Sequence, residues 1–200
     1  MCQFPLFETL AIIDGKFQNR FFHQQRIDFA FKHYLKTETT LFIEQMEIPI
    51  QYHNGFFRCR IDYNHQTFNI GFYAYQPKEI KTFQCVYVKD FDYQFKYSDR
   101  KALEKLDNKK CDEVIIINND KVSDCKIGNL LFLKQNKWYS PKDYLLKGTQ
   151  LSYLIEQNKI QLVEIKAEDL FTYEKIMWIN ALNPFDPDRA ILINMETIFV

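Results

Sequence analysis

The segment that decides the fold is Asp112–Leu133, with the sequence DEVIIINNDKVSDCKIGNLLFL. Its first apolar run, Glu113–Asn118, is closed by Asn118-Asn119-Asp120, a pattern typical of a β-strand that ends in a turn. A second apolar run, Asn129–Leu133, precedes Lys137–Tyr139, and we expect these two runs to pair as strands. The segment therefore predicts short strands joined by polar turns.

Helical patterns lie on both sides of this segment. Ser98–Leu106 predicts a short helix that opens with the cap candidate Ser98, and Gly148–Gln157 predicts a helix with Thr149 near its cap. Further strands are expected at Leu162–Ile165 and Lys175–Ile179, with a helical turn at Ala167–Phe171.

The first half of the chain reads mainly as strands. Phe7–Ile13, Asp14-Gly15 and Lys16–Phe22 predict a hairpin, because Asp-Gly tolerates the positive φ of a tight turn. His23–Lys36 has apolar residues at helical spacing. Three β-rich runs then predict an antiparallel meander: Gly55–Tyr63, Thr67–Tyr75 and Ile80–Lys89.

These elements predict an α+β, or mixed α/β, fold in two lobes with a boundary near Tyr93. We expect a small N-terminal α+β domain at residues 1–93 and a larger C-terminal domain at residues 94–200.

Composition excludes several classes of protein. The 200 residues contain 26 Lys+Arg and 26 Asp+Glu, so the net charge is zero and gives no electrostatic signal for nucleic acid or an anionic membrane. No apolar run reaches the about 18 residues of a membrane helix, and MCQFPLFETL lacks the features of a signal peptide. The sequence predicts a cytoplasmic protein with neither a membrane nor a nucleic acid partner.

The cysteines and histidines form no recognisable site. Five widely spaced cysteines, Cys2 among them, contain no CxxC pair, and the four histidines have no metal-binding spacing. We therefore expect no disulfide framework and no metal. With five glycines in all, a glycine-rich phosphate loop is not expected either.

Four features could carry chemistry. Arg26 lies within a predicted helix, Lys96 lies where an aromatic-rich strand gives way to a helix, and Asp124 follows the VIII strand. Gly148-Thr149 opens a helix whose N–H groups can bind an anion. Taken singly, each is better explained as a surface charge, a turn residue or an ordinary cap, because motif matches this short recur by accident.

The order of the motifs resembles the class IV aminotransferases of pyridoxal phosphate (PLP) fold type IV. This superfamily includes branched-chain and D-amino-acid aminotransferases and 4-amino-4-deoxychorismate lyase. The resemblance runs from about Phe7 to Pro184 through seven blocks in the family's order: FETLAIIDGKF, HQQR, YQFKYSDRKALEKL, DEVIIINNDKVSDCKIGNLLFL, KWYSP, LLKGTQ and IMWINALNP. It implies that residues 94–200 form a shortened PLP-binding domain.

The resemblance implies the cofactor pyridoxal 5'-phosphate and a set of residues that hold it. Lys96 matches the family's Schiff-base lysine, which is also the natural base for the substrate's Cα proton. Asp124 falls where the family usually carries the Glu that faces the pyridine nitrogen, and a carboxylate there keeps that nitrogen protonated. Arg26 matches the arginine that grips the phosphate.

Further contacts to the cofactor follow from the same resemblance. Thr149 and Gln150 occupy the helix-opening turn that binds the phosphate, and Asn180 and Ala181 lie in the INAL loop that contacts phosphate and substrate. Arg60 is a weaker candidate for a substrate carboxylate, and we favour a solvent-facing strand arginine as its explanation because surface arginines are common. Asn129 is interpreted as structural support for Asp124.

The chain departs from the family in two residues and in length. Asp124 is one methylene shorter than Glu, Leu151 stands where the family often has Arg, and the chain is several dozen residues short of typical members.

Three functions remain open. The first, which we expect, is transamination of an amino acid or related amine with a 2-oxo acid. The second is a 4-amino-4-deoxychorismate lyase that releases 4-aminobenzoate and pyruvate for folate synthesis; the INAL segment and the short chain make it the nearest alternative. The third is a catalytically degenerate PLP-binding scaffold. The resemblance also implies a homodimer.

Overall fold

The computed structural model describes residues 3–106 and 110–200, so Cys2 lies outside the described residues. The chain forms two compact units. We call Met1–Pro77 with Phe95–Asp99 the N-terminal unit, and Lys78–Gln94 with Arg100–Val200 the C-terminal unit. We predicted a domain boundary between residues 93 and 94. In the structure the chain passes from the C-terminal unit to the N-terminal unit at the next peptide bond, between Gln94 and Phe95.

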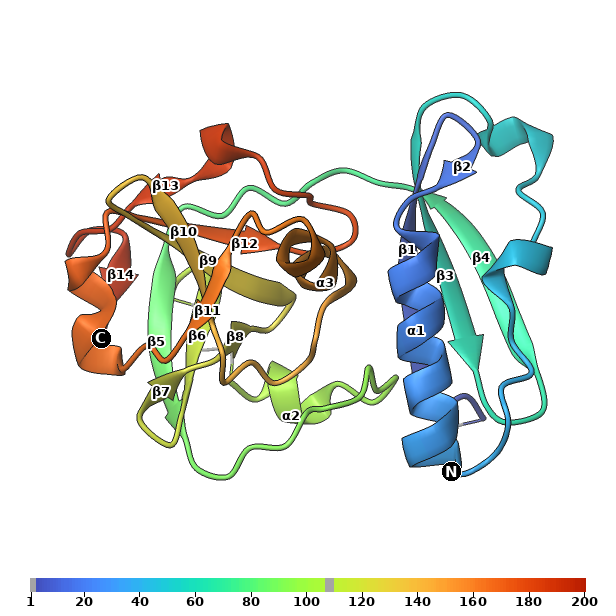
Figure 1. The fold of residues 1–200 in the computed structure, drawn as a ribbon, viewed down its shortest axis with the longest axis horizontal. Helices are drawn as coiled ribbons and strands as arrows, with labels where there is room; N and C mark the ends of the chain where they lie inside the picture. The colour runs from blue at the N-terminus through green and yellow to red at the C-terminus, as the bar shows by residue number, and fades with distance from the viewer. Residues whose placement is uncertain (1–2, 107–109) are drawn as a thin grey trace. The chain divides into compact units, whose positions relative to one another are not determined.

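The N-terminal unit is built on an antiparallel sheet with the strand order β2-β1-β3-β4 (Figure 1). The strands are β1 (Leu6–Ile13), β2 (Lys16–Phe17), β3 (Phe56–Tyr63) and β4 (Phe68–Ala74). The predicted hairpin turn is confirmed, because Asp14 and Gly15 both have positive φ, 46° and 73°. The second strand is shorter than predicted, since the helix begins at Arg20.

One face of this sheet is covered by helix α1 (Arg20–Ala30), which continues as the wider helical turn Phe31–Leu35. The predicted helix is thus confirmed, and it starts three residues earlier than the sequence indicated. The core between helix and sheet contains Ile27, Ala30 and Phe31 from the helical segment. The connection from Lys36 to Gly55 contains the 3-10 turns Ile43–Gln45 and Ile50–Tyr52.

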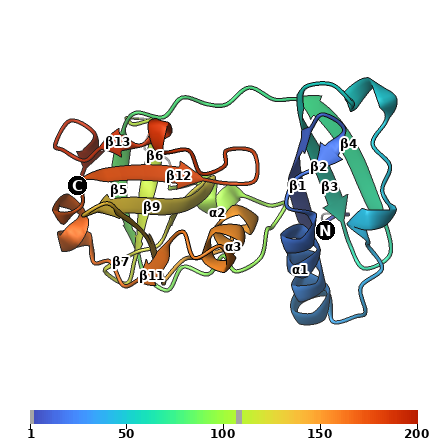
Figure 2. The ribbon, with the colours of Figure 1, turned by 45° about the horizontal axis from the view of Figure 1, so that its top comes forward.

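The C-terminal unit contains two sheets (Figure 2). The first has the order β14-β5-β6-β7 and the second β11-β10-β9-β12-β13, with β8 paired to β9. Their strands are β5 (Phe83–Val88), β6 (Glu113–Asn118), β7 (Lys121–Val122), β8 (Asp124–Cys125), β9 (Gly128–Lys134), β10 (Lys137–Pro141), β11 (Gln161–Val163), β12 (Lys175–Ile179), β13 (Ile191–Leu192) and β14 (Ile198–Phe199).

The helices of this unit are short. They are α2 (Lys101–Glu104), α3 (Thr149–Glu156) and the 3-10 turns Ala167–Thr172 and Pro187–Arg189. The prediction of α3 is confirmed. The helix predicted at Ser98–Leu106 is reduced to α2, and the Ser98 hydroxyl has no hydrogen-bond partner among the described residues, so Ser98 is not its cap.

The predicted three-stranded meander is wrong in its last strand. β5 does not pair with β4; it lies parallel to β6, with Phe83 opposite Glu113. β6 is buried along five of its six residues, as expected of a strand covered on both faces, and this run offers β5 a larger apolar surface than the exposed edge strand β4. The α+β class itself is confirmed.

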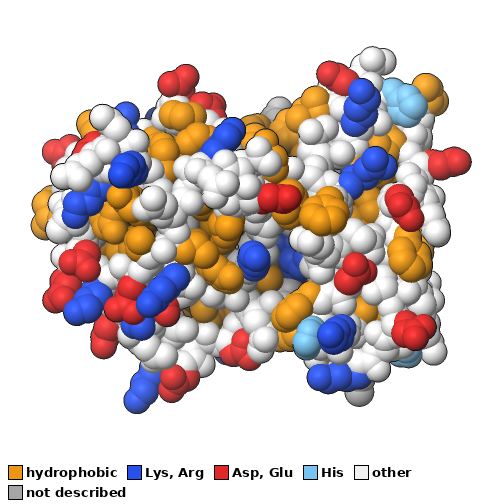
Figure 3. Space-filling view, in the orientation of Figure 1, with side chains coloured by type: hydrophobic (Ala, Val, Ile, Leu, Met, Phe, Trp, Pro, Cys, Tyr) orange, Lys and Arg blue, Asp and Glu red, His pale blue; other side chains and the backbone are white. Residues whose placement is uncertain are grey.

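The surface and the helices agree with the composition. Figure 3 shows acidic and basic side chains interspersed over the visible face, with apolar side chains scattered between them. Among the helices that the structure describes, none combines the length and apolar character required to cross a membrane. The described cysteines, Cys59, Cys85, Cys111 and Cys125, are free thiols.

Candidate functional site

Asp124 lies in a tight hairpin of the C-terminal unit. β8 pairs with the start of β9, which sets Asp124 opposite Asn129 and Cys125 opposite Gly128. The Asp124 carboxylate is buried and accepts three hydrogen bonds. Its Oδ1 accepts from Asn129 Nδ2 (2.8 Å), and its Oδ2 accepts from the backbone N–H groups of Leu145 (2.9 Å) and Leu146 (3.0 Å).

Among the described residues, no cationic side chain balances the charge of this carboxylate. Burial raises the pKa of Asp124 to about 7, although the three hydrogen bonds act in the opposite direction. Within residues 3–106 and 110–200, no Lys, Arg or His side chain forms an ion pair with it. A cation that hydrogen-bonds to Asp124 would therefore be strongly favoured there.

Asn129 connects Asp124 to the start of helix α3. Besides its bond to Asp124, Asn129 Nδ2 donates to the Leu146 carbonyl (2.9 Å), and its Oδ1 accepts from Gly148 N–H (3.1 Å). A Cβ at Gly148 would collide with this Oδ1, so the cap position must be glycine. Thr149 and Gln150 form the buried first turn of α3, at the helix end where backbone N–H groups bind anions.

The loop after β12 packs against the same hairpin. Asn180 Nδ2 donates to the Ile127 carbonyl (3.0 Å), while its Oδ1 accepts from the N–H groups of Leu182 and Asn183 (both 2.9 Å). A Cβ at Gly128 would collide with the Ile179 carbonyl oxygen, so the two segments are in close contact. Ala181 lies in the turn that Asn180 closes. The C-terminal unit thus brings Asp124, the start of α3 and the Asn180 loop together around one hairpin.

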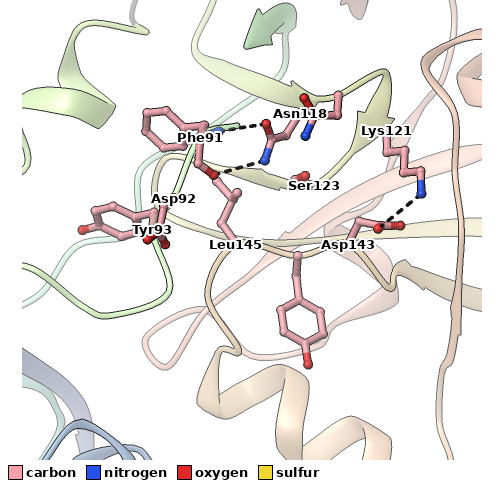
Figure 4. A pocket seen from close by; sticks show the side chains of 10 residues that line it. Phe91, Asp92, Tyr93, Asn118, Lys121, Ser123, Asp143 and Leu145 are labelled. Atoms are coloured by element: carbon pink, nitrogen blue, oxygen red, sulfur yellow. Dashed lines mark hydrogen bonds and ion pairs between the residues drawn. The ribbon is translucent and has the colours of Figure 1, made fainter. Parts of the chain in front are cut away.

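The C-terminal unit also contains a pocket of about 410 Å³ (Figure 4), and Asp124 is not among the residues that line it. Leu145, whose N–H holds Asp124, lines it, as do Ser123 and Asp143. Ser123 Oγ and Asp143 Oδ2 are buried without a hydrogen-bond partner among the described residues. The pocket therefore offers two polar atoms without partners, which could not be predicted from the sequence.

Lys96 is held on the N-terminal unit, alongside β1 and not at the end of a strand. Its carbonyl accepts a hydrogen bond from Phe7 N–H (3.0 Å), and Ser98 N–H donates to the Pro5 carbonyl (2.8 Å). The preceding Phe95 is buried and stacks on Phe29 of α1 at 5.6 Å between ring centroids. Lys96 Nζ itself lies 4.8 Å from the centroid of the Phe7 ring.

Arg26 forms a buried cluster with Glu8 and His23. Arg26 donates to both Glu8 oxygens, through Nε (2.8 Å) and Nη2 (2.7 Å), and His23 Nδ1 lies 2.7 Å from Glu8 Oε2. Burial alone would raise the pKa of Glu8, but Arg26 and His23 outweigh it and lower the pKa to about 2. Burial lowers the pKa of His23, with Arg26 and Lys96 adding to that effect. The cluster is therefore a Glu8–Arg26 ion pair beside a neutral imidazole.

Glu8 is the residue of this cluster that sequence reasoning missed. It is the one charged residue in the otherwise apolar strand LFETLAII, and it is completely buried. A charged residue at an inward position of a strand signals a buried partner.

Arg60 is already paired within the N-terminal unit. Its Nε and Nη2 donate to the two carboxylate oxygens of Asp62 (2.8 and 2.6 Å), and its guanidinium carbon lies 4.0 Å from the centroid of the Phe7 ring. The structure thus gathers Lys96 and Arg60 at Phe7 and ties Arg26 to Glu8, while the other predicted residues lie in the C-terminal unit.

Comparisons with known proteins identify the family. The family model for amino-transferase class IV matches residues 88–190, about half of the chain. The chain belongs to the class IV aminotransferases. Members of this family are PLP-dependent enzymes, as the order of the sequence motifs indicated, so the resemblance is confirmed.

Two Haemophilus proteins are similar to this chain over nearly its full length. An uncharacterized protein of Haemophilus influenzae is 43% identical over 185 residues, which cover 90% of this chain and 98% of that protein. The crystal structure of a candidate 4-amino-4-deoxychorismate lyase from Haemophilus somnus is 42% identical, with a TM-score of 0.85, and covers 92% of this chain and 100% of that one.

A more distant class IV structure confirms the fold alone. The branched-chain amino acid aminotransferase of Escherichia coli has a TM-score of 0.72 at 12% identity and covers 98% of this chain and 76% of that one. The predicted fold type IV architecture is therefore correct.

Proposed function

We propose that this protein binds pyridoxal 5'-phosphate, with Lys96 as the attachment point, and uses it to act on a substrate amine. The observation that carries the proposal is the Asp124 carboxylate: it is buried, accepts three hydrogen bonds and has no cationic partner among the described residues. A protonated pyridine nitrogen supplies the missing positive charge and a hydrogen-bond donor. The donor set around Asp124 thus fits the cofactor's ring.

The cofactor, when bound, supplies an aldehyde that condenses with amines and a ring that accepts electrons from the substrate's α-carbon. Asp124 keeps the proton on the ring nitrogen, which makes the ring a better electron acceptor. With the cofactor bound, the Lys96 amine would be the base that takes the proton from the substrate's Cα. Asn129 holds Asp124 in place, because its Nδ2 donates to Asp124 while its Oδ1 accepts from Gly148 N–H.

Two groups suit the cofactor's phosphate. The start of α3, at Thr149 and Gln150, directs helix N–H groups to an anion, and Asn129 fixes this helix end relative to Asp124. Arg26 is the second group. Two hydrogen bonds to Glu8 set the orientation of its guanidinium, and its match to the family's phosphate-binding arginine supports this assignment. Asn180 and Ala181 are proposed as further contacts from the loop packed on the same hairpin.

Of the two reactions that start in this way, we favour the lyase reaction. The candidate lyase from Haemophilus somnus is 42% identical to this chain, whereas the aminotransferase structures compared with it are 12–15% identical. In the lyase reaction, loss of pyruvate from aminodeoxychorismate leaves 4-aminobenzoate, and no second substrate is consumed. Transamination of an amino acid with a 2-oxo acid remains the second candidate, because the cofactor-binding residues serve both reactions equally.

Borohydride reduction followed by peptide mapping tests the attachment. Wild-type protein loaded with the cofactor is expected to be yellow and to carry the reduced cofactor on the peptide that contains Lys96. Lys96→Ala should abolish the label, while the exposed Lys89→Ala, the matched control, should retain it. A label on another lysine, or none on the wild type, would contradict the proposal.

An assay without an amino acceptor separates the candidate functions. Release of pyruvate from aminodeoxychorismate with no added 2-oxo acid identifies the lyase, and strict dependence on a 2-oxo acid identifies the aminotransferase. Yellow protein that does neither, and whose colour does not change when amino acids are added, is the degenerate scaffold.

We further propose a homodimer, as the family resemblance implies. Sedimentation equilibrium tests this: a mass near twice 24.2 kDa supports the homodimer, and a monomer mass at all concentrations contradicts it.

A further inference from the structure

Two polar side chains that line the pocket of the C-terminal unit lack hydrogen-bond partners. Ser123 is 1% exposed, and its Oγ has no partner among the described residues. The Asp143 carboxylate has one printed neighbour of opposite charge, Lys121 Nζ, which lies 3.7 Å from Oδ1 and is too distant for a hydrogen bond. Its Oδ2 is buried and has no partner in the same part of the chain. Because buried polar atoms are normally hydrogen-bonded, a ligand that contacts both residues would be stabilising.

The lining of this pocket is held in place by hydrogen bonds within the protein. The Asn118 side chain donates to the Phe91 carbonyl and accepts from the Phe91 N–H, both at 3.1 Å (Figure 4). The N–H of Leu145 is held by Asp124 Oδ2 at 2.9 Å. A volume of about 410 Å³ suits a small molecule, and a lining that is already ordered loses little conformational entropy when the molecule binds.

The charges around the pocket favour a cation. Lys121 and Lys142 share the Glu164 carboxylate, through ion pairs of 2.9 and 3.1 Å. Lys121 also approaches Asp143, so these two lysines and two carboxylates balance one another. Asp92 lines the same pocket and forms no ion pair with any described Lys, Arg or His, so it adds a further negative charge. The surplus attracts a positively charged ligand and repels an anion.

The two oxygen atoms without partners indicate which kind of cation fits. The ionised Asp143 carboxylate can only accept a hydrogen bond, and the Ser123 hydroxyl can accept one as well as donate one. An ammonium group supplies both the positive charge and several N–H donors. A metal ion fits less well, because no group of three or more His, Cys, Asp or Glu residues in the described chain could hold one. Phe91 and Leu145 add apolar surface for the carbon skeleton of an organic ligand.

We propose that this pocket binds a small organic ammonium ion. Asp143 Oδ2 is the charged acceptor, and the Ser123 hydroxyl is a second hydrogen-bond partner. None of the residues proposed above to contact the cofactor lines the pocket. The inference is therefore independent of the proposed function.

Titration of the purified full-length protein with piperidine, followed by the NMR signals of its backbone amides, tests the proposal. Piperidine is protonated at neutral pH and has two N–H donors on an apolar ring. As a secondary amine, it does not form the imine that a primary amine forms with an aldehyde. Wild type is expected to bind it saturably, with shifts of the Ser123 and Leu145 amide signals.

Two further probes separate charge from hydrogen bonding in wild type. Tetrahydropyran has the same ring without the charge, and N,N-dimethylpiperidinium has the charge without an N–H donor. Each should bind about tenfold more weakly than piperidine, because neither can form a charge-assisted hydrogen bond to Asp143.

Variants of the two polar residues test their roles. Asp143→Asn keeps the shape of the side chain and removes its charge, so it should weaken piperidine binding about tenfold. Ser123→Ala should weaken it about threefold, as expected for the loss of one neutral hydrogen bond. Asp188→Asn, at an exposed carboxylate outside the pocket, is the matched control and should leave binding unchanged.

Four results would overturn the proposal: no saturable binding of piperidine to wild type, equally tight binding of either other probe, shifts centred on residues outside the lining, or no loss in Asp143→Asn. The three probes are compared on wild type, so a variant that fails to fold in thermal unfolding does not remove the test. Borohydride labelling of Lys96 tests the proposed function separately.

Discussion

Asn129 Nδ2 lies 2.8 Å from Asp124 Oδ1, and the other end of the same amide accepts the N–H of Gly148. Asn129 must therefore donate to a carboxylate and accept from a backbone amide at once. Asparagine does both, whereas aspartate can only accept. Asn129 therefore connects Asp124, in the β8–β9 hairpin, to the start of α3 by hydrogen bonds.

Replacing this amide by a carboxylate should be strongly destabilising. Asn129→Asp has the same shape, but it sets two buried carboxylates against each other and removes the donor to the Leu146 carbonyl. We expect a loss of about 3 kcal/mol in the free energy of unfolding at pH 7, measured by urea denaturation. The exposed Asn136→Asp, also in a turn, should change it by less than about 0.5 kcal/mol. Equal stability of Asn129→Asp and wild type would refute the linking role.

Asp124 should make the apoprotein less stable as the pH rises toward neutrality. Because its folded pKa of about 7 lies above the ordinary 3.8, the folded state holds a proton that the unfolded state has lost between these values. Its contribution to stability is therefore greatest below pH 3.8 and is lost as the pH rises through 7, by about 4 kcal/mol in total.

Comparing wild type with Asp124→Asn isolates this contribution. Urea unfolding of the two apoproteins at pH 5, 6, 7 and 8 gives the free energy of unfolding of each. As the pH rises, that of wild type should fall relative to that of Asp124→Asn. The exposed Asp120→Asn should show no such trend. A difference that does not vary with pH would mean that the Asp124 pKa is not raised.

Local elements could be predicted from the sequence because their signals are local. Asp14-Gly15 suits a turn with two positive φ angles whatever surrounds it, and α3 begins where Gly148-Thr149 indicates. Pairing partners could not be predicted in the same way. β5 follows β4 closely in sequence, yet it pairs with β6. The buried apolar strand β6 is distant in sequence, and its pairing with β5 is seen only in the folded chain.

In the candidate site, too, the sequence predicted single residues but not their partners. The motifs selected Lys96, Asp124 and Arg26 as chemically suitable residues. They could not reveal that Arg26 is held by Glu8 or that Arg60 is neutralised by Asp62, since each pair depends on which side chains share a face of the sheet.

The Glu8–Arg26 pair should govern stability in acid. The folded pKa of Glu8, about 2, lies below the ordinary 4.5, so its contribution is fully present above pH 4.5 and is lost as the pH falls toward 2. That loss amounts to about 3 kcal/mol. Glu8→Gln removes it and also leaves the Arg26 charge without its partner, so we expect about 3–5 kcal/mol lower stability at pH 7.

Denaturation between pH 2 and 7 measures this effect. The stability of wild type should fall more steeply than that of Glu8→Gln between pH 4.5 and 2, while the exposed Glu44→Gln should follow wild type. Parallel curves for wild type and Glu8→Gln would show that the ion pair does not lower the Glu8 pKa.

Gly128 should tolerate no side chain, because the Asn180 loop lies against it. A Cβ at this position would meet the Ile179 carbonyl oxygen, a backbone atom of β12 that cannot rotate away. Gly128→Ala should therefore lower the free energy of unfolding by about 3 kcal/mol and weaken cofactor binding, because the hairpin holding Asp124 must move away from Asn180. Gly71→Ala is the matched comparison, since its new methyl group meets only the Tyr73 side chain, which can rotate, and the loss should be smaller. Thermal unfolding and cofactor titration of both variants decide the matter: if Gly71→Ala is the more damaging for cofactor binding, the contact between the Gly128 hairpin and the Asn180 loop is not what fixes Asp124.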